Sequence, residues 1–74
     1  MFSDHDVAAN VLQLMKKIAN ELNQSLVELD GRIPEDEWKA YRFAVGRIRA
    51  EMLGEVTYHI GERYPDLRIV LYGE

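Results

Sequence analysis

The sequence contains no cysteine, which excludes disulfide bonds and thiolate metal sites. Its hydroxyl side chains other than tyrosine are Ser3, Ser25 and Thr57, and none lies on the glycine-rich turn that exposes a nucleophilic serine. The glycine spacing matches neither a dinucleotide-binding nor a phosphate-binding fingerprint. No apolar run approaches the roughly 18 residues that a membrane-spanning helix needs. We therefore expect no catalytic residues, no cofactor and no membrane partner.

The 74-residue chain has room for one domain, and its 13 acids and nine bases give a net charge of −4. An acidic chain lacks the clustered lysines and arginines that bind nucleic acid, so we expect no nucleic-acid partner. The N-terminal residues are acidic, unlike a secretory signal, and we expect a cytoplasmic protein. A chain this short buries only about 60% of the surface of its unfolded form, which leaves a metal, self-association or very efficient helix packing to supply further stability.

One amphipathic helix is predicted over residues 4–29, because apolar side chains recur there with heptad spacing. Ser3, with Asp6 three residues later, is expected to cap its N-terminus, and Gly31 can adopt the left-handed conformation that ends a helix. Further apolar residues flank the seam and widen the apolar arc to roughly 160°, enough for two neighbours. The seam is formed by Ala8, Leu12, Met15, Ala19, Leu22, Leu26 and Leu29, and the flanking residues are Val7, Val11, Leu14 and Ile18.

A second helix is predicted over residues 34–63, because Pro34 suits a first helical position, three acids follow it, and Pro65 ends the pattern. The connection over residues 30–33 is short, which makes the two helices antiparallel. The expected fold class is therefore all-α, a two-helix hairpin. The core seam of the second helix comprises Trp38, Tyr41, Val45, Ile48, Met52 and Val56, with Ile60 at its edge.

Residues 65–74 are expected to form an extended tail, because they contain the β-prone run from Ile69 to Tyr72. A single strand has no partner within this chain. The tail therefore docks on the helices, pairs with the same segment of a second subunit, or stays loose.

Small residues form a row on the second helix, where Gly46, Ala50 and Gly54 follow at intervals of four and Thr57 and Gly61 extend the row. A glycine inside a helix costs roughly 0.5–1 kcal/mol relative to alanine. We interpret the row as a place where another helix approaches closely, either the first helix of the same chain or the second helix of another. The alternative is that Gly46 and Gly54 mark a bend or are merely tolerated.

Both predicted helices thus have more than one contact surface, and two helices alone cannot cover them all. A homodimer of hairpins, forming a four-helix bundle, covers these surfaces without further assumptions, although the wide face of the first helix also permits a tetramer. The expected interface comprises Gly46, Ala50, Gly54, Thr57, Tyr58, Gly61, Val11, Leu14, Ile18, Ile69, Leu71 and Tyr72.

Carboxylates and an imidazole recur on the second helix, where Glu51, Glu55 and His59 are four residues apart and Glu62 follows three later. These are the ligand types of metal sites in helical bundles. Di-iron bundles, however, place the glutamate three residues before the histidine, and Glu55 lies four before His59. We therefore predict no metal site and interpret Glu55 and His59 as an intrahelical pair.

Two other charged clusters have structural interpretations. Residues 4–6 combine two aspartates with His5 at a helix N-terminus, where we expect capping and complementarity to the helix dipole. Lys39, Arg42 and Arg49 form a basic strip near Gly46, with too few charges for a phosphate or an anionic membrane surface. We interpret them as exposed cations that pair with neighbouring acids such as Glu35.

The expected function is a non-catalytic protein–protein interaction module, acting as a homodimeric adaptor, regulator or assembly factor. One alternative is an acidic inhibitor or immunity-type protein that blocks a basic partner, because a net charge of −4 would speed association with a cationic target. The other alternative is a metal-binding helical-bundle enzyme that uses Glu51, Glu55, His59 and Glu62.

Overall fold

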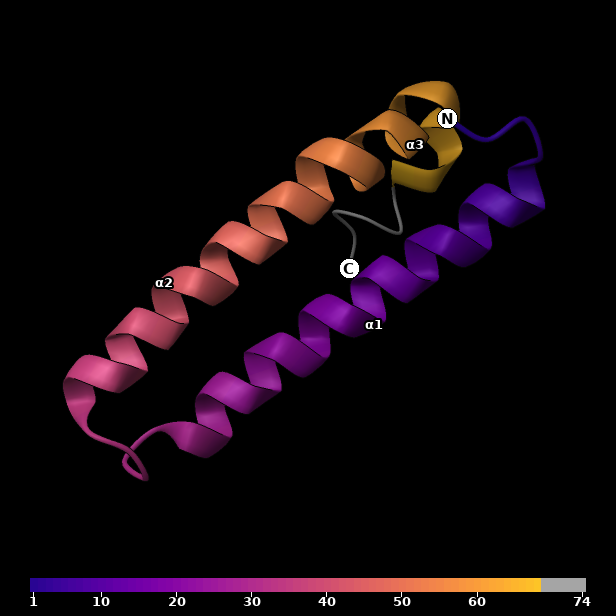
Figure 1. The fold of residues 1–74 in the computed structure, drawn as a ribbon. Helices are drawn as coiled ribbons and strands as arrows, with labels where there is room; N and C mark the ends of the chain where they lie inside the picture. The colour runs from indigo at the N-terminus through magenta and orange to yellow at the C-terminus, as the bar shows by residue number, and fades with distance from the viewer. Residues whose placement is uncertain (69–74) are drawn as a thin grey trace.

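The computed structural model describes residues 1–68, which form two antiparallel helical arms (Figure 1). The first arm is α1, His5–Leu29, and the second begins with α2, Glu35–Met52. The second arm continues through a π-helical turn, Leu53–Thr57, into α3, Tyr58–Arg63, and a 3₁₀ turn follows at Pro65–Leu67. The molecule measures 45 × 19 × 17 Å. The predicted all-α hairpin is therefore confirmed.

The ends of α1 are set by two local features. Asp4 is the N-cap: its Oδ1 accepts hydrogen bonds from the backbone N–H groups of Asp6 at 2.8 Å and Val7 at 3.2 Å. The expected cap Ser3 was thus one residue early, since Asp4 is an equally good capping residue and its charge also favours the helix N-terminus. At the other end, Gly31 has a φ of 81°, as predicted for the residue that ends the helix.

The second arm departs from α-helical geometry at the π-helical turn, where the N–H of Tyr58 bonds to the carbonyl of Leu53 five residues earlier. Such a turn inserts one residue and rotates everything after it by about 100°. The rotation brings Thr57, Ile60 and Gly61 to the side facing α1, where all three are buried. The helical backbone predicted for residues 34–63 is therefore present from Glu35. The side chains after the π-helical turn, however, face other directions than a regular helix would give them.

The largest core cluster lies where α1 begins and α3 ends. Ala8 and Leu12 pack there against Ile60 and Leu67, and Val45 is buried separately on α2. Leu67 reaches the core because Pro65–Leu67 forms a 3₁₀ turn, which differs from the extended segment that we expected to begin at residue 65. Phe2, Ala9, Val11, Val56 and Tyr64 pack around the cluster.

Polar contacts join the two arms near the hairpin turn. The indole N–H of Trp38 donates to the carbonyl of Leu26 at 2.9 Å. The hydroxyl of Ser25 donates to the carbonyl of Leu22 at 2.6 Å, so the Tyr41 hydroxyl, 2.7 Å away, is the donor to Ser25. Trp38 and Tyr41, which we predicted in the core, are half-buried between the arms.

Substitutions of two glycines by alanine are expected to change stability in opposite directions. Gly31→Ala should lower the free energy of unfolding by about 1 kcal/mol, because an L-residue is strained at a φ of 81°. Gly46→Ala should raise it by about 0.5–1 kcal/mol, because an added Cβ meets no atom within 4 Å and alanine favours the helix. Urea denaturation followed by circular dichroism measures both changes, and a destabilised Gly46→Ala variant would contradict this description of α2.

Candidate functional site

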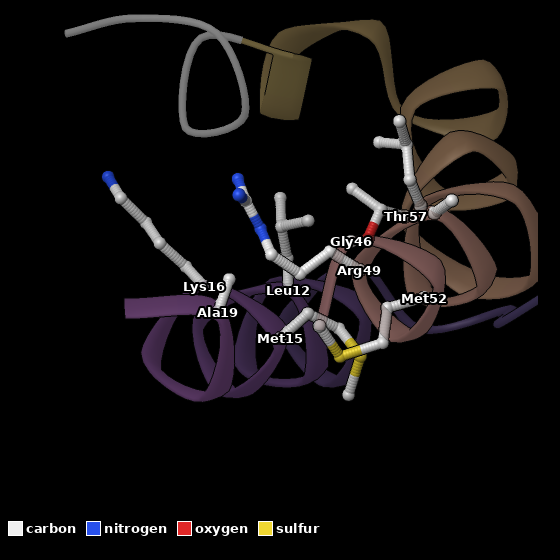
Figure 2. A pocket seen from close by; sticks show the side chains of 10 residues that line it. Leu12, Met15, Lys16, Ala19, Gly46, Arg49, Met52 and Thr57 are labelled. Carbon is white, nitrogen blue, oxygen red and sulfur yellow. The ribbon is translucent and has the colours of Figure 1, made fainter. Parts of the chain in front are cut away.

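A groove of about 370 Å³ separates α1 and α2 in the middle of the hairpin (Figure 2). It is open because the facing residues Ala19, Gly46 and Ala50 are small. Lys16 and Arg49 extend from one side of it, whereas Met15 and Met52 lie together on the other side (Figure 2). The remaining lining residues are Leu12, Leu53 and Thr57.

A second hollow of about 390 Å³ lies on the outer surface of α2 and shares Gly46 and Ala50 with the first. Phe43, which is 69% exposed, lines it. We call the two adjoining hollows the basic groove. Its basic residues are Lys16, Lys39, Arg42, Arg47 and Arg49.

The basic groove contains five of the nine basic residues of an acidic chain, and none of the acids in residues 1–68 lines it. The predicted pairing of the basic strip with acids holds for Lys39, whose Nζ lies 3.1 Å from Glu35. Arg49 instead donates to the Asn23 side chain at 3.2 Å, and the guanidinium of Arg42 lies 5.9 Å from the Trp38 ring centre. The groove is therefore a local positive surface on a negative protein.

The row of small residues predicted on the second helix is divided by the π-helical turn. Gly46 and Gly54 face open space within residues 1–68, because an added Cβ at either position meets none of their atoms within 4 Å. The first helix of the same chain therefore does not approach them closely. Thr57 and Gly61 are instead buried against the chain's own core side.

Exposed apolar side chains lie on the side of the hairpin away from Lys16. Val7 and Leu14 of α1 are 44% and 50% exposed, and Ile48 of α2 is 47% exposed although we expected it in the core. The contact between Tyr41 and Ser25 sets the register of the two antiparallel helices. Ile48 lies seven residues after Tyr41, so it lies level with the residue seven positions before Ser25. That position is Ile18, which is half-buried, as is Val11. We call Val7, Val11, Leu14, Ile18 and Ile48 the apolar stripe.

Helical geometry keeps the apolar stripe and the basic groove apart. Lys16 is two residues, about 200°, from both Leu14 and Ile18. Ile48 is likewise two residues from both Gly46 and Ala50. A partner on one surface therefore leaves the other accessible.

The candidate metal ligands Glu51, Glu55, His59 and Glu62 are exposed. Within residues 1–68, no three histidine, aspartate or glutamate side chains lie where they could hold a metal ion. The π-helical turn explains the separation, since it inserts a residue between Glu51 and His59 and ends their regular spacing of four. The ring of His59 packs edge-on to its neighbour Tyr58, with 6.1 Å between ring centres.

Three predicted interface residues, Ile69, Leu71 and Tyr72, lie outside the described residues. Tyr58 is 52% exposed on α3. Phe43 and Arg47, which line the basic groove, were not predicted as site residues. The signal was present in the sequence, since no acid occurs between Glu37 and Glu51 while four bases do.

A contact that the sequence did not indicate fastens the N-terminus to the end of α3. The Nε2 of His5 lies 2.7 Å from Oδ2 of Asp66, and its ring packs edge-on to Tyr64 at 5.0 Å. The Tyr64 hydroxyl donates to the carbonyl of Phe2 at 3.0 Å. The hydrogen bond to Asp66 raises the pKa of His5 above its ordinary 6.5, with the charges of Asp66 and Asp6 adding to it and desolvation opposing it.

The raised pKa of His5 predicts pH-dependent stability. The pKa of His5 is higher in the folded protein than in the unfolded chain, where it is 6.5. The contact with Asp66 therefore stabilises the fold fully below pH 6.5. This stabilisation is lost as the pH rises through the pKa of the folded state. His5→Gln keeps a donor for Asp66 but does not titrate. The denaturation midpoint of the native protein relative to this variant should therefore be higher at about pH 5.5 than at about pH 8.5.

His59→Gln is the matched control, because it keeps the His5–Asp66 contact and should keep the pH step. An identical pH dependence in the native protein and His5→Gln would show that this contact does not stabilise the fold.

No helix in residues 1–68 is long and apolar enough to cross a membrane. Comparison with known proteins gives no match, whether to a protein-family model, a curated protein or a solved structure. Function is therefore inferred from the two surfaces of the hairpin.

Proposed function

We propose that the chain is a non-catalytic protein–protein interaction module of the cytoplasm, an adaptor, regulator or assembly factor that acts as a homodimer. The observation that carries this proposal is the exposed apolar stripe, which runs along α1 and continues onto α2. The described residues contain only five buried apolar side chains. A small domain with so few commonly gains stability by self-association.

Charge favours the apolar stripe over the basic groove as the dimer interface. A two-fold axis brings a surface against its own copy. The stripe would meet another uncharged stripe, and the expected interface residues Val11, Leu14 and Ile18 would be buried there together with Ile48. Two basic grooves would instead oppose ten cations, and like charges facing each other across an interface cost several kcal/mol.

In this dimer, the two hairpins would pack as a four-helix bundle with the stripes inside. The Gly46–Ala50 surface would stay outside the interface, which differs from the placement that the row of small residues suggested. The alternative of an acidic inhibitor for a basic partner has less support, because both open hollows carry basic side chains.

Leu14→Glu is expected to dissociate the dimer, because it places a charge in the apolar stripe at a side chain that is already 50% exposed in the single chain. Sedimentation at micromolar concentration should give about twice 8.6 kDa for the native protein and 8.6 kDa for the variant. Helicity should persist, since Leu14 lies outside the core cluster.

Gln13→Glu adds the same charge at the neighbouring exposed position, about 100° away, and should leave the mass unchanged. A folded native protein that stays monomeric would contradict the dimer. A dimer that survives Leu14→Glu would place its interface elsewhere.

A further inference from the structure

The basic groove combines depth, apolar lining and charge of one sign. Its two hollows of about 370 and 390 Å³ share Gly46 and Ala50, so they adjoin each other along α2. Each volume lies within the roughly 300–1,000 Å³ typical of binding sites. The depression exists because α2 carries glycine and alanine at its centre, where larger side chains would fill it.

The lining of the groove suits apolar side chains of a partner. Leu12, Met15, Met52 and Leu53 line the part between the helices. Methionine adapts its shape to different partners, and it is frequent at surfaces that bind helices. Phe43 lines the outer part and is 69% exposed, which leaves its ring available to contact a partner.

The rim of the groove selects for negative charge. Within residues 1–68, no carboxylate forms an ion pair with Lys16, Arg42, Arg47 or Arg49. Arg49 and Arg42 are oriented instead by Asn23 and the Trp38 ring. Both guanidinium groups therefore keep donors for carboxylates of another molecule.

We propose that the basic groove binds an acidic amphipathic helix of another protein. Apolar side chains at one face of that helix would enter the depression over Gly46 and Ala50, and flanking acids would pair with Arg42, Arg47 and Arg49. A second copy of the chain that packed groove against groove would be repelled, because its own cations would face those of the first copy. A nucleic acid is disfavoured because the groove is lined with apolar side chains and the chain has a net charge of −4.

This inference deepens the proposed function, since it rests on the chain being an interaction module and names the chemistry of its partner. It does not depend on the dimer. The apolar stripe lies on the opposite side of both helices, so each surface can be tested while the other is intact.

The test uses the full chain and a fluorescein-labelled synthetic helix with leucines at positions i, i+3, i+4 and i+7 and glutamates beside them. Anisotropy at low and at moderate salt measures its dissociation constant. A second peptide has lysine for each glutamate, and a third has the same composition in scrambled order. We expect the acidic amphipathic peptide to bind at least about tenfold more tightly than either control, and to weaken as salt increases.

Variants of the chain locate the binding. The double variant Arg42→Glu with Arg49→Glu should weaken binding at least about tenfold. The double variant Lys17→Glu with Arg32→Glu makes an equal charge change at two exposed positions that do not line the groove, and it should change binding less than about twofold. Gly46→Leu should weaken binding by filling the depression while raising the denaturation midpoint, because an added side chain begins in open space. A substitution that merely disturbed the structure would lower both the affinity for the peptide and the denaturation midpoint.

The proposal is overturned if the acidic peptide fails to bind, if the lysine peptide binds equally well, or if the groove variants bind like the native chain. It is also overturned if single-stranded DNA displaces the peptide completely, since the groove would then be a site for a polyanion. Loss of the dimer in the groove variants would overturn it too, because the groove would then bind a second copy of the chain. Leu14→Glu separates the two proposals: it should abolish the dimer and keep peptide binding.

Discussion

Burial of Ile60 against Ala8 and Leu12 holds the end of the second arm on the first, and it depends on the one residue inserted at the π-helical turn. In a regular helix, Ile60 would lie about 60° away from the direction of Val45, and Thr57 about 120° away. The inserted residue rotates both toward α1. The same rotation places Leu67 where a single 3₁₀ turn can close the core, and it brings Tyr64 and Asp66 within reach of Phe2 and His5.

The packing that results is uneven along the hairpin. One end is closed by the core cluster and the His5–Asp66 contact, and the other by the hydrogen bonds of Trp38 and Tyr41. Between them, Ala19, Gly46 and Ala50 are too small to fill the space between the arms. Gly46 lowers helix stability by roughly 0.5–1 kcal/mol and makes no close contact in return with the residues that the structure describes. An internal glycine of this kind fits the interaction with another molecule that we propose for the basic groove.

The sequence was sufficient for the hairpin, because heptad spacing, the acids after Pro34 and the left-handed Gly31 are local signals that tertiary contacts reinforce. It was insufficient for the π-helical turn, since any analysis at 100° per residue assumes one register throughout. That assumption placed Thr57 and Gly61 in one row with Gly46 and Gly54, and His59 in line with Glu51. The His5–Asp66 contact was also hidden, because it joins residues 61 positions apart in the chain.

The charges of the candidate site were visible in the sequence, but their meaning required the structure. Exposed lysines and arginines beside an acidic turn ordinarily pair with it, and Lys39 does so with Glu35. Arg42 and Arg49 do not, and Gly46 between them opens onto a depression instead of a neighbouring helix. A surface of one sign cannot face its own copy across a two-fold axis without repulsion, whereas an uncharged stripe can. Charge is therefore the reason why we propose two different kinds of partner for the two surfaces of this small hairpin.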